Sequence, residues 1–179
     1  ERGLRANYQI QRTLKAQSEV RYNTLNRNNK SDLGRNRDIS SWIMDQNFSY
    51  RPLPVWEFGL DSELGLEEDL AARTTATNSD LSLRYLRLLG RINYSLLQKG
   101  RLTAEYDLIN VDVLDNPGQR AVPYEMARGK KEGLNKQWRL RGDYTVATNI
   151  VFSVFYEGRD EATYQKVIHT GQAEIRAFF

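Results

Sequence analysis

The 179 residues contain no cysteine, one histidine and only four prolines. Because cysteine is absent, the fold relies on no disulfide. The lack of any cysteine or histidine cluster predicts that no transition metal or other cofactor is bound. Twelve glycines and four prolines are too few for a collagen-like or disordered chain. The scarce residue types therefore predict an ordered fold without covalent cross-links.

Long apolar runs are missing as well. No stretch of about 18 apolar residues occurs, which excludes a transmembrane helix. A mean hydropathy of −0.67 agrees with that exclusion. The absence of such a run does not exclude strands that cross a membrane, because only alternate residues of such a strand contact lipid.

Charges of the two signs are interleaved along the chain rather than segregated into one patch. The 26 lysines and arginines are interleaved with 23 acidic residues, so the net charge of +3 is not gathered into one patch. Nucleic-acid binding normally requires a basic patch or stripe. We therefore expect no nucleic-acid partner.

Apolar and polar residues alternate along most of the chain. Alternation with a period of two predicts strands that have one apolar and one polar face, rather than helices. We count nine such strands. The alternating segments are Leu4–Ile10, Leu14–Tyr22, Trp42–Tyr50, Trp56–Leu66, Leu86–Leu96, Leu102–Leu108, Trp138–Val146, Ile150–Tyr156 and Gly171–Phe179.

Short and long connections take turns between these segments. The short turns lie near residues 11–13, 52–54, 98–100 and 147–149, and the longer connections cover 26–38, 71–79, about 115–136 and about 158–162. This order predicts an all-β fold, an antiparallel up-and-down meander of about nine long strands. Short turns on one side and long loops on the other are typical of a transmembrane β-barrel. We therefore expect residues 1–179 to form a single region, either a barrel or a segment of one.

The alternation slips by one residue in two places. The apolar positions shift between Tyr85 and Leu86, and again between Leu108 and Ile109. A β-bulge would cause such a slip. The alternative is a strand end that projects beyond the buried zone.

Aromatic residues are expected at two levels on the apolar face. Tyr8, Phe48, Tyr50, Trp56, Tyr94, Tyr144 and Phe152 lie near the short turns, and Tyr22, Trp42, Tyr85, Tyr106, Trp138 and Tyr156 lie toward the long connections. Two aromatic girdles at membrane interfaces would have this arrangement. A sandwich core that is rich in aromatic residues is the alternative.

The polar face carries charges whose sign alternates from strand to strand. The residues expected to line a lumen are Glu57, Asp61, Glu63, Arg87, Arg91, Glu105, Asp107, Arg139 and Arg141. Opposite charges on neighbouring strands stabilise pairing modestly. These residues are therefore interpreted either as a hydrated lining or as a purely structural ladder of ion pairs.

The last alternating segment carries a family resemblance. Gly171, Ala173, Ile175, Ala177 and Phe179 share one face, and the chain ends on the phenylalanine. This pattern resembles the C-terminal signal that bacterial outer-membrane β-barrels present to the barrel assembly machinery. Ala173 and Ala177 depart from it, because larger apolar residues are commoner there.

The resemblance implies a location and partners. It places the protein in the outer membrane of a Gram-negative-type bacterium, in contact with lipid and lipopolysaccharide. The short turns would then be periplasmic and the long loops external, so residues 1–179 would be the C-terminal portion of a larger barrel. The basic loops Asn26–Asp38 and Arg120–Lys131 could contact lipopolysaccharide phosphates.

Three functions fit these features. The first is part of a channel, transporter or secretion pore, the second a structural or surface-binding barrel that uses its long loops, and the third a soluble envelope β-sandwich. Catalysis is not expected, because His169 falls on the apolar face and the sequence places no serine beside it.

Overall fold

The computed structural model describes residues 2–27, 37–70, 80–97, 99–116, 119, 121–163 and 166–178. Within these residues, nine strands form one antiparallel sheet in the order β1 to β9. The strands are β1 (Arg2–Gln11), β2 (Leu14–Arg27), β3 (Arg37–Leu53), β4 (Trp56–Asp69), β5 (Leu81–Leu96), β6 (Gly100–Asp115), β7 (Gly133–Ala147), β8 (Ile150–Asp160) and β9 (Ile168–Ala177). The predicted all-β, up-and-down meander of nine strands is confirmed.

A single short helix interrupts this pattern in the described residues. It is the 3₁₀ helix η3 (Ala127–Gly129), in the connection between β6 and β7. Helices of the length and apolarity needed to span a membrane are absent from the described part of the chain.

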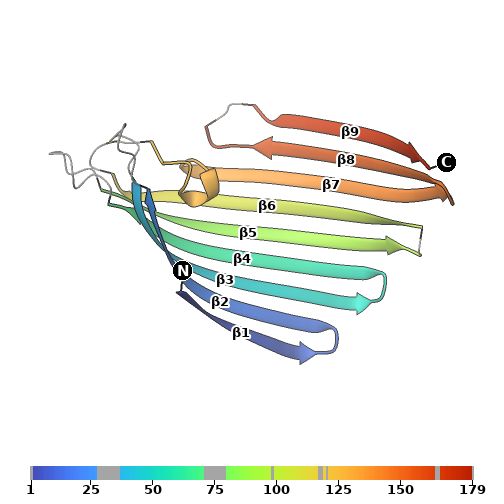
Figure 1. Ribbon diagram of the computed structural model, residues 1–179, viewed down its shortest axis with the longest axis horizontal. Helices are drawn as coiled ribbons and strands as arrows, with labels where there is room; N and C mark the ends of the chain where they lie inside the picture. The colour runs from blue at the N-terminus through green and yellow to red at the C-terminus, as the bar shows by residue number, and fades with distance from the viewer. Residues whose placement is uncertain are drawn as a thin grey trace.

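All nine strands pair with their sequence neighbours, so the short turns gather at one end of the sheet. Figure 1 shows these turns on the right, beside the C-terminus, and the opposite ends of the strands on the left. Because the strand number is odd, β1 and β9 run in the same direction. No pairing joins these two strands in the described residues, so the sheet is open.

The two faces of the sheet differ in chemistry. One carries exposed apolar side chains on every strand, among them Leu88, which is 40% exposed. We call this face the apolar face. The opposite face, which we call the polar face, carries most of the charged residues. This division follows from the period-two alternation, because successive side chains of a strand point to opposite sides.

The slip in alternation on β5 is not a bulge. Pairing between β4 and β5 runs without a register shift from Trp56 opposite Tyr94 to Asp69 opposite Leu81. The bulge interpretation is therefore wrong on this strand. Instead, Leu83 and Tyr85 lie on the polar face, so the expectation that Tyr85 belongs to an aromatic girdle is also wrong.

These side chains belong to a small hydrophobic core on the polar face, near the long connections. The core consists of Ile39, Leu81, Leu83, Tyr85, Ile109, Val111, Met126 and Ala127. Ile109 and Val111 explain the second slip, since β5 and β6 pair without interruption there. Apolar residues change face because the β6–β7 connection covers this end of the polar face.

Candidate functional site

The strand register places all nine predicted lumen-lining charges on the polar face. Glu63 lies opposite Arg87, and a second row runs through Arg91, Glu105 and Arg139 on β5, β6 and β7. Asp107 shares this face with them. The polar face is the candidate functional site.

Two clusters of ion pairs hold the centre of this face together. Arg87 donates from Nε and one terminal nitrogen to the two carboxylate oxygens of Asp107, at 2.8 and 2.7 Å. Glu105 accepts a hydrogen bond from Arg91 at 2.8 Å and forms an ion pair with Arg139 at 3.0 Å, so it bridges β5 and β7. Paired, bidentate geometry fixes the side chains more firmly than a single contact would.

Two of the remaining predicted charges have partners closer in the chain than expected. Glu57 binds Arg51 of the same hairpin at 2.6 Å, and Arg141 lies 3.4 Å from Asp143 on its own strand. Asp61 accepts from Asn47 and lies 3.9 Å from Arg91. The predicted pairing of opposite charges across strands is therefore present from Asp61 on β4 to Arg139 on β7, but Glu57 and Arg141 pair locally instead.

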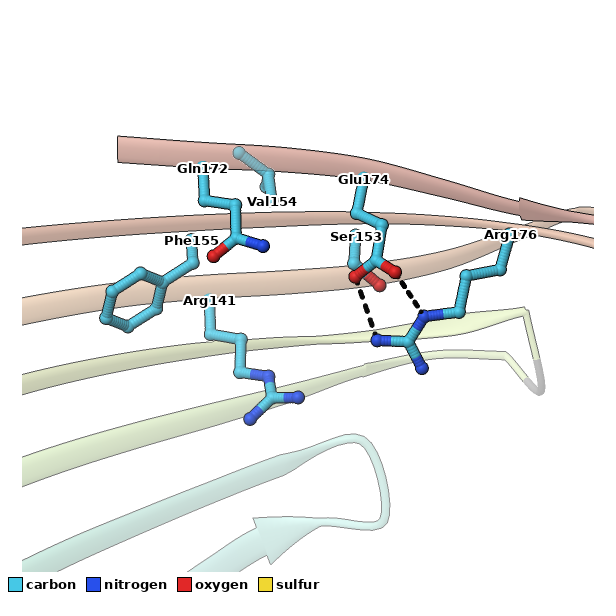
Figure 2. Close-up of a pocket in the computed structure, with 7 residues that line it drawn as sticks. All are labelled: Arg141, Ser153, Val154, Phe155, Gln172, Glu174 and Arg176. Carbon is cyan, nitrogen blue, oxygen red and sulfur yellow. Dashed lines mark hydrogen bonds and ion pairs between the residues drawn. The ribbon is translucent and has the colours of Figure 1, made fainter. Parts of the chain in front are cut away.

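A hollow of about 230 Å³ opens on the polar face near β9. Figure 2 shows Gln172, Glu174 and Arg176 of β9 pointing toward the same space as Arg141 of β7. Arg176 binds Glu174 at 2.8 and 2.9 Å within the strand. The hollow is thus lined by paired charges, the Gln172 amide and the Phe155 ring.

Residues 121–132, called the docked loop below, fold over the polar face. Met126 is fully buried, and Ala127 beside it is also buried in the hydrophobic core. Burying a methionine side chain stabilises a fold by about 1.5–3 kcal/mol. Ala127 and Arg128 adopt positive φ angles of 46° and 54°. Each of these costs roughly 1–2 kcal/mol for a non-glycine residue, so the contacts must offset strain in the loop.

Two buried carboxylates of β4 hold the docked loop. The backbone N–H of Ala127 donates to Glu67 at 2.7 Å. Arg128 Nε donates to Glu63 at 2.7 Å, and the Tyr85 hydroxyl donates to the same Glu63 oxygen at 2.6 Å. A second guanidinium nitrogen of Arg128 also contacts Glu63. Removing one partner of such a pair leaves an uncompensated buried charge, which is strongly destabilising.

The Arg128 guanidinium is a permanent cation in this position. Hydrogen bonding to Glu63 raises the pKa of Arg128 above its already high ordinary value, against the smaller opposing effect of burial. Asp45 on β3 also favours the charged form. Its own partner is Arg21, whose Nε lies 3.1 Å away.

Ion pairs tie the docked loop to distant strands. Glu125 lies 2.9 Å from Arg27 at the end of β2, and Lys130 lies 3.1 Å from Glu161, which follows β8. The docked loop thus contacts chain segments on both sides of β4–β6.

The sequence pattern did not predict this cluster. The alternation places Glu63 in a lumen lining, but it does not indicate Glu67, Tyr85 and Met126 as its neighbours, nor Arg128 as its partner. The slip in alternation on β5 and β6 was the signal. It marks apolar residues on the polar face, and these require a cover.

Of the thirteen aromatic residues expected at the two levels, all except Tyr85 lie on the apolar face. These twelve are Tyr8, Tyr22, Trp42, Phe48, Tyr50, Trp56, Tyr94, Tyr106, Trp138, Tyr144, Phe152 and Tyr156. Trp56 packs on Tyr94 with ring centroids 4.4 Å apart, and Tyr22 packs on Trp42 at 4.8 Å. Adjacent aromatic residues therefore form contacts across strands at both levels.

A polar boundary limits the apolar face toward the long connections. The first polar residues beyond the apolar stretch on β3 to β7 are Ser40, Glu68, Arg84, Asn110 and Lys136. Within the apolar stretch, Ser18 donates to Gln46 at 2.6 Å, and Ser62 shares their row. The Ser18–Gln46 hydrogen bond lowers the cost of facing an apolar medium.

The only histidine lies on the apolar face. His169 Nδ1 is 2.8 Å from the Tyr156 hydroxyl, and its ring lies 6.1 Å from that of Trp138. No cluster of three or more potential metal ligands occurs in the described residues. His169 thus packs within an aromatic group.

The residues of the predicted assembly signal lie on the edge strand β9. Gly171, Ala173, Ile175 and Ala177 share the apolar face. Phe179 lies outside the described residues, as do residues 28–36 of one basic loop and Arg120 of the other.

Comparison with protein-family models and with curated proteins found no match for this chain.

Proposed function

We propose that this chain forms part of the wall of an outer-membrane β-barrel that serves as a channel, transporter or secretion pore. One observation carries the proposal: an apolar face is exposed on all nine strands, and a charged face lies directly behind it. Lipid on one side and water on the other would satisfy both faces.

The size of the apolar face argues against exposure to water. Nine strands about 4.8 Å apart span roughly 38 Å, and eight residues along a strand cover roughly 26 Å. Their product is on the order of 1,000 Å². Soluble monomers rarely expose contiguous apolar patches beyond about 300–600 Å². A lipid environment removes this discrepancy.

The charged face supports a water-filled space on the other side. Arg91, Glu105 and Arg139 are only partly buried, so water reaches them even though they are paired. A soluble β-sandwich would instead cover the apolar face with a second sheet. The described strands all belong to one sheet.

Further strands must complete the barrel in this proposal. β1 and β9 run in the same direction, so joining them directly would give a parallel pair in an otherwise antiparallel sheet. Each unpaired backbone group costs several kcal/mol in hydrocarbon. Antiparallel strands from outside residues 1–179 would pair with both edges.

The proposed location brings two partners. The residues Ile175 and Ala177 face outward near the C-terminus, where the barrel assembly machinery would recognise the last strand. The long connections would lie at the external surface, close to lipopolysaccharide. A structural barrel that binds a surface partner through those connections would have the same fold as a pore but would not conduct ions.

Detergent dependence and conductance test the proposal. The purified full-length protein should remain folded only in detergent or lipid, and should give stepwise conductance in planar bilayers. Recovery as a monodisperse, soluble monomer without detergent would contradict the membrane assignment. A folded, membrane-inserted protein without conductance would favour the surface-binding barrel.

A further inference from the structure

The docked loop brings charge and bulk to the polar face. Its residues Met126 and Ala127 pack with Leu83 and Tyr85 in the hydrophobic core. The guanidinium of its Arg128 contacts Glu63 on β4. If the polar face lines a passage, the docked loop occupies part of that passage beside β4, β5 and β6.

Several independent contacts indicate that the docked loop is held in place. The apolar contact uses Met126, the backbone contact joins Ala127 to Glu67, and the ionic contact joins Arg128 to Glu63. The flanking pairs of Glu125 and Lys130 connect the same loop to the sheet margins. Release would expose Leu81, Leu83 and Tyr85 to water together.

Arg128 also changes the electrostatics of this part of the polar face. Glu63, Glu67 and Asp45 form an acidic group on β3 and β4, and Arg21 compensates Asp45. Arg128 is the cation bound to Glu63. An uncompensated carboxylate beside a narrow aqueous path attracts cations, because a low-dielectric wall strengthens its field.

We propose that the docked loop is a fixed constriction of the passage, and that Arg128 is a specificity-determining residue that prevents Glu63 from making the constriction cation-selective. This inference rests on the proposed function. The seating of the loop is tested separately from conduction, so that failure of the loop inference and failure of the pore proposal give different results.

Thiol labelling tests the seating of the docked loop. Since residues 1–179 contain no cysteine, single cysteines can be introduced into the full-length protein, with any cysteine elsewhere in it replaced. Met126 is fully buried and Tyr124 is 84% exposed. Met126→Cys should react with a water-soluble maleimide at least tenfold more slowly than Tyr124→Cys, and Ala127→Cys provides a second buried position. Equal rates in protein that keeps its native circular dichroism would overturn the seated loop.

Ion selectivity tests the role of Arg128. In a salt gradient across a planar bilayer, Arg128→Met should shift the reversal potential toward cation preference. Glu63→Gln should shift it toward anions, because Arg128 is then uncompensated. The double variant should return close to the wild-type value, and Tyr85→Phe, which removes a donor but no charge, should leave the sign unchanged.

The outcomes separate the two proposals. Conducting variants whose reversal potentials all match the wild type would refute the role of Arg128 while leaving the pore intact. Protection of Met126→Cys without any conductance would refute the pore and with it the selectivity role. Shifts in opposite directions for Arg128→Met and Glu63→Gln would support the inference.

Discussion

At the residue scale, Tyr85 illustrates how one side chain links the sheet to the docked loop. Its ring lies across Gly65 on β4, and its hydroxyl donates a hydrogen bond to Glu63. Met126 and Ala127 of the docked loop belong to the same hydrophobic core as Tyr85. A glycine opposite the aromatic ring leaves the space that the ring occupies. The position of Tyr85 therefore depends on the absence of a side chain at residue 65.

Gly65→Ala should destabilise the fold. The added Cβ would collide with the Tyr85 ring, and moving that ring disturbs the Glu63 hydrogen bond. Overpacking of this kind costs about 1–3 kcal/mol. Urea unfolding of the full-length protein in detergent measures the effect.

Gly59→Ala is the matched control on the same strand and face. Its added Cβ would lie 3.6 Å from Arg91 Cβ, which is an ordinary van der Waals contact. We expect little change in the urea midpoint. An equal loss for Gly59→Ala and Gly65→Ala would show that strand glycines, rather than the ring contact, determine the result.

At the element scale, each strand divides its residues between two environments. On β5, Leu88 points to the apolar face and Arg91 to the polar face. Arg91 shares Glu105 with Arg139, so its removal leaves that carboxylate with a partner. The two positions therefore respond differently to a change of polarity.

Leu88→Arg should impair membrane assembly far more than Arg91→Leu. A charge on the lipid face near the midplane of a bilayer costs about 2–4 kcal/mol. Arg91→Leu removes a partly exposed ion pair and should act mainly on conductance. The amount of protease-resistant protein recovered from the membrane fraction compares the variants. Equal recovery would contradict the assignment of the two faces.

At the scale of the whole molecule, the open sheet sets the main constraint. The outer edges of β1 and β9 have no strand partner in the described residues. In water such edges can be solvated, but in hydrocarbon they cannot. The arrangement is thus suited to a wall that other strands continue.

Residues 1–179 expressed alone should fail to form a stable pore. The edge strands would leave unpaired N–H and C=O groups in lipid, each at a cost of several kcal/mol. Flotation with liposomes and single-channel recording, with the full-length protein in parallel, provide the measurement. A stable conducting pore from this segment alone would show that the nine strands close without further strands.

Local residue patterns determined much of this architecture. Leu4, Tyr8 and their equivalents alternate with polar residues, and the pleat of a strand turns such alternation into two faces without help from distant parts of the chain. The turns near residues 11–13 and 147–149 follow from the breaks between alternating segments. Strand number, strand order and the chemistry of each face were therefore predictable.

Only the tertiary structure decided what happens at the end of the polar face. Alternation predicts which face of the sheet a side chain lies on, but not what covers that face. The change of phase after Tyr85 was therefore also compatible with a bulge. The docked loop places Arg128 beside Glu63, 65 positions earlier, and Ala127 beside Glu67, 60 positions earlier. Such contacts arise from the path of a long connection through space. No periodic signal records that path, because irregular backbone has no repeat.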